Sequence, residues 1–155
     1  MARPFVPDDF AAPRGLTAGP FRLVPLGPEH NASDHAAWGS SIEHIRSTAG
    51  FEGADWPPVG GMTPDENLDD LRQHAEDFAA RQGFTYTVLG ADDTVAGCVY
   101  IYPSEDRGFD VDVRSWVRAD VAHLDEELRD VVAAWLSERW PFERIRYARG
   151  SGRTP

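Results

Sequence analysis

The sequence predicts an α+β domain in which a mainly antiparallel sheet lies against helices. Three runs rich in β-branched and aromatic residues, 84–89, 95–102 and 109–118, follow one another with only short turns between them. Consecutive strands joined by tight turns pair antiparallel. Helical patterns precede and follow the three runs, which is the order expected when helices pack on such a sheet.

The length of 155 residues suits one domain. We expect an extended arm over 1–20, because four prolines and two glycines there oppose a helix or a central strand. A single domain is expected over 21–149, followed by a frayed tail over 150–155. No internal repeat or low-complexity block divides the chain.

Charge and composition exclude several classes of function. The net charge is −11 and all 15 basic residues are arginine, so lysine nucleophiles are excluded and nonspecific binding to nucleic acid is opposed. No apolar run reaches the roughly 20 residues of a membrane helix, and the N-terminus has no secretory apolar block. We therefore expect a cytoplasmic protein without membrane or nucleic-acid partners. The lone Cys98 excludes an internal disulfide and is expected to be a buried thiol.

The first half of the sequence predicts one strand followed by two helices. The run 21–26 predicts a strand, which Pro25 confines to an edge or ends. A patchy apolar stripe over 31–48 predicts a helix with a break at Gly39-Ser40-Ser41. Thr63, Pro64 and Glu66 form a capping-box pattern that begins a helix, and Gly83 ends it.

The second half is organised around a strand that leads into a helix. Over 109–118 alternate residues share a face, whereas the apolar residues between Leu124 and Leu136 recur at helical spacing. Pro141 ends this helix. The run 142–147 is a last strand, which gives five strands in all.

This order resembles the GNAT superfamily of acyl-CoA-dependent N-acyltransferases over about 21–147. The match is carried by the order of elements, by Ser115-Trp-Val-Arg-Ala-Asp120 and by Trp135-Leu-Ser-Glu-Arg-Trp-Pro-Phe142. The resemblance implies that the strand end at 115–120 pairs with the pantetheine arm of acetyl-CoA and that the following helix carries the coenzyme A site. The family usually continues with another helix and two strands, so a GNAT-like sheet truncated after the fifth strand is expected.

The segment 121–127 departs from the family's pattern. It lacks the family's glycine-containing phosphate loop, and Asp125, Glu126 and Glu127 crowd the first helical turn, where they repel a polyanion. Two functions therefore stay open. One is transfer of an acetyl group from acetyl-CoA to an amine of a small molecule or peptide; the alternative is a non-catalytic binding or assembly module that has lost coenzyme A binding.

The resemblance places candidate site residues on and after the strand over 109–118. Asp112 and Asp110 are the candidate general bases, because they share a face and their repulsion could raise one pKa; the alternative is that they are solvated or paired with arginine. The cofactor-binding candidates are Trp116, Val117, Arg118 and Arg114. Glu105 is a weaker base, and Tyr100, Tyr102 and Tyr147 are candidate acids.

The histidines show no metal-ligand pairing such as H-E-x-x-H, so no metal is expected. The last strand, 142–147, would leave an unpaired sheet edge, which predicts a homodimer paired across that edge. Glu143, Arg144 and Arg146 offer the competing interpretation, because charges on an edge strand keep edges apart.

Overall fold

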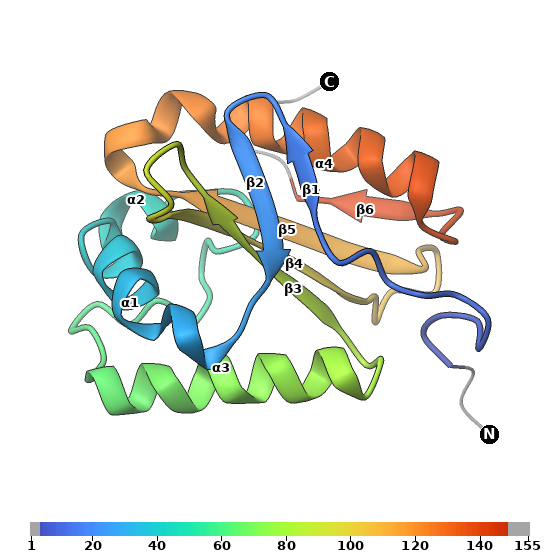
Figure 1. Cartoon of the computed structure of the whole chain (residues 1–155), viewed down its shortest axis with the longest axis horizontal. Helices are drawn as coiled ribbons and strands as arrows, with labels where there is room; N and C mark the ends of the chain where they lie inside the picture. Colours follow the sequence, from blue (N-terminus) through green and yellow to red (C-terminus); the bar gives the residue numbers. More distant parts are fainter. Residues whose placement is uncertain (1–3, 149–155) are drawn as a thin grey trace.

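In the computed structural model, which describes residues 4–148, six strands form one sheet between two layers of helices (Figure 1). The strands are β1 (Leu16–Ala18), β2 (Phe21–Pro25), β3 (Phe84–Leu89), β4 (Val95–Pro103), β5 (Val111–Val117) and β6 (Ile145–Tyr147). The α-helices are α1 (Asn31–Gly39), α2 (Ile42–Arg46), α3 (Pro64–Ala79) and α4 (Asp125–Arg139), and η1 (Pro28–His30) and η2 (Ala119–Leu124) are short 3₁₀ helices.

The strands lie in the order β1-β2-β3-β4-β5-β6. Neighbours from β1 to β5 are antiparallel, whereas β6 runs parallel to β5 because α4 carries the chain back between them. The predicted α+β class and the mixed, mainly antiparallel sheet are confirmed. The count of five strands is wrong, because Leu16–Ala18 pairs with β2 and adds a sixth.

The helices follow the sequence prediction except at the end of α3, which stops at Ala79 and not at Gly83, because Arg81 takes the left-handed conformation (φ 61°). The break in the first helical pattern separates α1 from α2, and α4 ends at Arg139, just before the Trp140-Pro141 step. At the start of α3 the Thr63 hydroxyl accepts from the Glu66 amide while the Glu66 carboxylate accepts from the Thr63 amide, so the capping box is confirmed. Within residues 4–148 no helix is long and apolar enough to cross a membrane.

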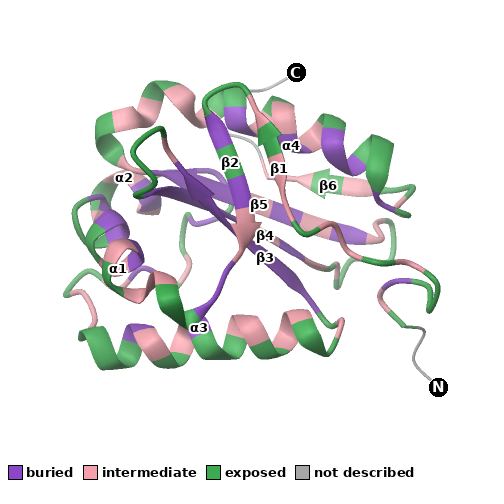
Figure 2. Cartoon of the chain, in the orientation of Figure 1, coloured by how far each residue is buried: buried purple, intermediate pink, exposed green. Residues whose placement is uncertain are grey.

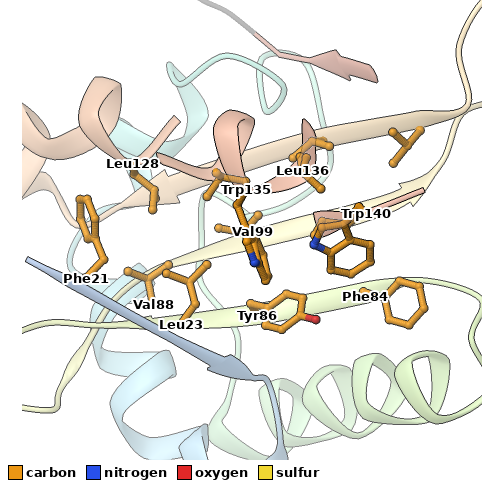
Figure 3. Packing of buried hydrophobic residues seen from close by; sticks show 14 of the residues in the cluster. Phe21, Leu23, Phe84, Tyr86, Val88, Val99, Leu128, Trp135, Leu136 and Trp140 are labelled. Carbon is orange, nitrogen blue, oxygen red and sulfur yellow. The ribbon is translucent and has the colours of Figure 1, made fainter. Parts of the chain in front are cut away.

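Helix α4 packs on one face of the sheet and forms the larger core. Its buried residues Leu128, Val132, Trp135 and Leu136 contact apolar side chains of β2 to β5. Figure 3 shows the Trp135 and Trp140 rings lying over Tyr86 and Phe84, and the ring centroids of Tyr86 and Trp135 are 5.1 Å apart. This aromatic contact fixes the end of α4 and therefore the point from which β6 starts.

The opposite face of the sheet carries a second core under α1 and α3. Trp38, Ile45, Phe51, Cys98 and Trp116 are fully buried there, so the expected burial of Cys98 is confirmed. Figure 2 shows the central strands buried along most of their length, with exposed residues on the outer sides of the helices. This face, with α3 along it, holds the cavities described below.

The segment before β1 is attached to the domain. Arg81 donates to the carbonyl oxygens of Phe10 and Pro7, and the Tyr86 hydroxyl donates to the Pro13 carbonyl oxygen. The expected arm over 1–20 therefore contains the strand β1, and its residues from position 4 on are held against the domain by these hydrogen bonds. The tail over 150–155 lies outside the described residues. At the other side of the sheet β6 is an edge strand in the described part of the chain, and the homodimer stays a prediction.

Gly97, in the middle of β4, lies where β4 and β5 approach each other closely. A Cβ atom at Gly97 would lie 2.2 Å from the Trp116 carbonyl oxygen, a backbone atom that cannot move without breaking the ladder. Overpacking of this kind costs about 1–3 kcal/mol. We expect Gly97→Ala to lower the free energy of unfolding by at least that amount in urea denaturation. Gly39→Ala is the matched control, because no atom lies within 4 Å of its added Cβ; equal stability of the two variants would contradict the close approach.

Candidate functional site

Strands β5 and β6 pair over only three residues and then separate. The register runs from Val111 opposite Ile145 to Val113 opposite Tyr147, and the last bond is donated by the Ala148 amide to the Val113 carbonyl oxygen at 2.9 Å. Strand β5 continues to Val117. Within residues 4–148 no strand pairs with the final part of β5 on that side.

The peptide groups of Ser115 and Val117 face this unpaired side and form what we call the open edge of β5. The Arg118 amide donates to the Ala96 carbonyl oxygen on β4. Since bonding directions alternate along an antiparallel pair, Arg114 and Trp116 also face β4, while Ser115 and Val117 face away from it. The open edge is a place where a ligand with amide groups could extend the sheet.

On the α4 side, side chains close over the open edge. The hydroxyl oxygens of Ser115 and Tyr147 are 2.5 Å apart, and Arg129 donates to the Ala148 carbonyl oxygen. Burial raises the pKa of the Tyr147 hydroxyl, so it stays protonated at neutral pH. An extended ligand at the open edge would have to fit beside this bridge.

A cavity of about 510 Å³ opens on the α3 side, at the point where β6 leaves β5. Val113 and Ala148, which make the last ladder bond, both line it. The remaining lining residues come from α3, β4, β5, β6 and the loop before α3: His74, Asp77, Tyr100, Tyr102, Asp112, Arg114, Arg146 and Gly50. The cavity therefore lies under α3 and reaches the last ladder bond between β5 and β6, after which the open edge begins.

Three side chains in this cavity form a hydrogen-bonded chain. The Tyr102 hydroxyl donates to Asp77 Oδ2 at 2.9 Å, and the Tyr102 oxygen lies 2.8 Å from His74 Nδ1. Nδ1 also lies 3.2 Å from the Thr85 hydroxyl. With the one phenolic proton on the carboxylate, the tautomer that joins His74 to Tyr102 carries its proton on Nδ1. The Nε2 atom of His74 is then the basic one.

Both aromatic groups of this chain stay neutral near pH 7. Burial lowers the pKa of His74, and this effect outweighs the opposing charge of Asp70. Burial likewise raises the pKa of the Tyr102 hydroxyl. A neutral imidazole fixed through Nδ1 is the form that accepts a proton from an amine.

Both aspartates predicted as bases are ion-paired with arginines: Asp112 with Arg146 of β6 and Asp110 with Arg144, the residue before β6. Asp112 lines the cavity, but its oxygens accept from Arg146 at 2.8 and 2.9 Å. Asp110 lies outside that cavity and accepts from the side chain of Arg144 and from the amides of Arg144 and Glu143.

The hypothesis that repulsion raises one of the two pKa values is wrong. Hydrogen bonds from Arg146 lower the pKa of Asp112, and hydrogen bonds from the Arg144 amide and side chain lower that of Asp110. Ionised, hydrogen-bonded carboxylates are weak bases. The catalytic assignment of these two residues stays a prediction that no observation here tests.

The four cofactor-binding candidates lie in different places. Val117 presents its peptide group to the open edge, whereas Trp116 bonds to β4 and its indole N–H donates to the Tyr100 hydroxyl at 3.0 Å. Arg118 is held on the β4 side, because it pairs with Asp120 at 2.9 Å and donates to the Val95 carbonyl oxygen. Arg114 lies in the cavity under α3.

The start of α4, where the family's phosphates would bind, is acidic and internally bonded. The Asp125 carboxylate lies 3.0 Å from His44 Nε2. Burial raises the pKa of Asp125, while His44, Arg129 and the Val117 amide oppose the rise. Glu126 and Glu127 follow in the same turn. These residues suit the positive end of the helix dipole and do not fit a diphosphate.

A second cavity of about 300 Å³ shares His74, Tyr100 and Arg114 with the first. Asp34 lies in its wall at only 4% exposure and accepts from the Asn67 side chain at 3.0 Å. Burial raises the pKa of Asp34 to about 6. The two cavities are neighbours, and their three shared residues lie between them.

Solved structures with this arrangement of elements are acetyltransferases. A ribosomal-protein-S5-alanine acetyltransferase from Vibrio fischeri is 12% identical with a TM-score of 0.67, over 86% of this chain and 72% of that chain. The chain has the GNAT fold.

Two further structures with the GNAT fold carry coenzyme A species. The microcin C7 self-immunity acetyltransferase MccE, in complex with acetyl-CoA and AMP, is 12% identical with a TM-score of 0.58, over 83% of this chain and 70% of that chain. RimL, a ribosomal L7/L12 α-N-protein acetyltransferase in complex with coenzyme A, is 11% identical with a TM-score of 0.59, over 76% of this chain and 64% of that chain. No family model and no curated protein matches the sequence.

His74 is the residue that the sequence interpretation missed. The histidines were considered only as metal ligands, and within residues 4–148 no group of histidine, cysteine and acidic side chains is arranged for a metal. The signal was its place in α3, three residues after Leu71 and four before Phe78, on the stripe that faces the sheet. A histidine on such a stripe is buried beside the site on this GNAT fold.

Asp34 should make stability depend on pH. Its pKa of about 6 lies above the ordinary unfolded value, so its contribution is fully present below about pH 4 and is lost as pH rises through 6. The ionised form therefore costs up to about 3 kcal/mol at pH 7. We expect Asp34→Asn to raise the free energy of unfolding at pH 7, with the gain vanishing near pH 4. Glu105→Gln, on an exposed turn, is the control; a gain in Asp34→Asn that does not change with pH would contradict the assignment.

Proposed function

We propose that this chain is an N-acyltransferase that moves an acetyl group from acetyl-CoA to a primary amine held in the cavity under α3. The observation that carries the proposal is the chain from Asp77 through Tyr102 to His74, which places a neutral base beside the open edge of β5. The GNAT fold and the acetyltransferase activity named for the structural neighbours support it.

His74 acts as the general base in this proposal. Its Nε2 accepts the proton that the amine loses on attacking the carbonyl carbon, while Tyr102 and Asp77 hold the ring through Nδ1 and stabilise the imidazolium that forms. The amine nitrogen forms the new bond to the acyl carbon as the bond from that carbon to sulfur breaks. Acetyl-CoA supplies the thioester.

The residues present fit the acyl end of acetyl-CoA better than its diphosphate end. The peptide group of Ser115 and the carbonyl of Val117 can pair with a pantetheine arm, whereas the Val117 amide already donates to the Asp125 carboxylate. The first turn of α4 instead carries Asp125 and its two following glutamates. Binding would therefore depend on the open edge more than on the helix start.

The alternative function is a GNAT-fold binding module without transferase activity. The acidic first turn of α4 favours it, together with the Ser115 to Tyr147 bridge across the open edge. In that case the cavity under α3 binds a small molecule, and the module acts through that ligand or through a partner protein. A cytoplasmic location and the absence of nucleic-acid partners are part of both proposals, and a peptide amine remains an acceptor candidate beside small molecules.

Titration with acetyl-CoA separates the two functions. We expect millimolar acetyl-CoA to raise the melting temperature, because a ligand at 100 times its dissociation constant adds about 2.7 kcal/mol to the free energy of unfolding. Adenosine 3′,5′-bisphosphate, which lacks the pantetheine arm, should produce no shift if the open edge carries the binding. Absence of any shift or calorimetric heat with millimolar acetyl-CoA would remove the transferase proposal and leave the binding module.

A substitution at His74 tests the base. His74→Asn keeps a donor at the position of Nδ1 and removes Nε2, so we expect turnover with acetyl-CoA and an acceptor amine to fall about 100-fold or more with acetyl-CoA affinity unchanged. Tyr102→Phe should shift the pH profile of turnover and reduce it less. Asp112→Asn is measured beside it, because the sequence predicts Asp112 as the general base. A larger loss of turnover in Asp112→Asn than in His74→Asn would assign the base to Asp112.

A further inference from the structure

Arg114 occupies the junction of the two cavities and is held there from three sides. Its guanidinium carbon lies 4.4 Å from the centroid of the Phe51 ring and 5.4 Å from that of Tyr100. Its Nη1 donates to the Gly50 carbonyl oxygen at 2.9 Å. Stacking and this one bond fix the planar group without using most of its donors.

The charge of Arg114 has no carboxylate partner in residues 4–148. Every ion pair there involves other residues, and Arg146 at the mouth of the cavity is paired with both Asp112 and Asp106. Within residues 4–148 only one of its five N–H groups has a partner, and a half-buried guanidinium that lines a cavity can bind a carboxylate through two parallel hydrogen bonds.

The loop at Gly50 is shaped to hold Arg114 in this position. Gly50 has a φ of +92°, and a Cβ there would lie 2.9 Å from the Cβ atoms of both Arg114 and Ala148. Only glycine combines that backbone conformation with such a close approach. The guanidinium is therefore already oriented before a ligand binds, which reduces the entropy lost on binding.

The side chains of His74 and Arg114 both contact the aromatic ring of Tyr100. The centroids of the His74 and Tyr100 rings are 5.6 Å apart, and both residues line both cavities. On the His74 side the carboxylates of Asp70 and Asp34 line the second cavity. The space between base and cation is thus negative at one end and positive at the other, and it is short.

We infer that the acceptor is a free α-amino acid, whose amine lies against His74 and whose carboxylate binds Arg114. The inference rests on the proposed function and narrows its acceptor. An internal or N-terminal peptide residue has no carboxylate a few bonds from its amine unless an acidic side chain supplies one. Arg114 then binds the acceptor rather than the cofactor phosphates that the sequence hypothesis assigned to it, because it lines the two cavities under α3, which no residue of the acidic first turn of α4 lines.

The test compares probes that differ only in the carboxylate. N-acetylglycine, N-acetyl-L-leucine and N-acetyl-L-phenylalanine, the products of the proposed reaction, are titrated beside their primary amides into isotopically labelled full-length protein. Binding is followed by the indole N–H signal of Trp56 and the Nε–H signal of Arg114. A charge-assisted pair contributes about 1.5–3 kcal/mol, so at least one acid should bind tenfold or more tightly than its amide.

Two variants at Arg114 and one control variant test whether Arg114 causes the preference for acids. Arg114→Gln should reduce the preference for acid over amide to about onefold, and Arg114→Lys should keep part of it, because lysine keeps the charge without the fork. Arg72→Gln, which removes an exposed arginine from α3, should leave the preference unchanged. Equal binding of acids and amides to the wild-type chain, binding of neither, or a preference that survives Arg114→Gln would overturn the inference.

These outcomes are independent of the transfer reaction. No thioester is present in the titration, so a chain that fails to bind acetyl-CoA can still show the preference for acids. Conversely, transfer to amino acid amides and free amino acids at equal rates would leave the transferase proposal intact and remove the role of Arg114.

Discussion

The separation of β6 from β5 is the constraint on which the rest of the site depends. The bond from the Ala148 amide to the Val113 carbonyl oxygen is the last one between β5 and β6, and beyond it β5 has no strand partner on the side away from β4 in the described chain. That separation produces the open edge and the mouth of the cavity together. The packing of Trp140 and Trp135 at the end of α4 sets where β6 begins and so fixes the separation.

The ion pairs between β5 and β6 belong to this architecture. A parallel pairing of only three residues contributes few ladder bonds. Arg146 on Asp112, and Arg144 on Asp110, add contacts that hold the short strand in register. Exposed pairs are individually weak, about 0–1 kcal/mol, but here two lie side by side and one carboxylate also accepts from two backbone amides. The contacts that the two carboxylates make are therefore those that hold β6 beside β5.

Local patterns in the sequence were sufficient to predict most helices and strands, but not the contacts between them. Thr63 and Glu66 predict the start of α3 because a capping box is made within four residues. The strand Leu16–Ala18 could not be read in the same way: it is three residues long, it lies among prolines and glycines, and only pairing with β2 makes it a strand.

The site was predictable in place but not in its residues. The sequence interpretation chose the junction of β5 with the following helix, because alternation along β5 shows which side chains share a face, and the cavity under α3 includes Asp112 and Arg114 of that strand. Which carboxylate would meet an arginine depended on β6, about 34 residues away in sequence for both pairs. His74 and Tyr102 come from different elements, so no local spacing links them.

The two ends of the site have opposite charge, and this difference orders the possible functions. At the start of α4 the carboxylates are stabilised by the helix dipole, and a diphosphate placed there would meet their repulsion without the lysines or glycines that usually offset it. Peptide hydrogen bonds at the open edge contribute about 0.5–1.5 kcal/mol each, which offsets part of the repulsion that a diphosphate would meet there. At the other end Arg114 offers an unpaired cation inside an aromatic enclosure. The chemistry under α3 is therefore the more strongly specified half of the molecule, and a small anionic ligand there is compatible with a transferase and with a binding module alike.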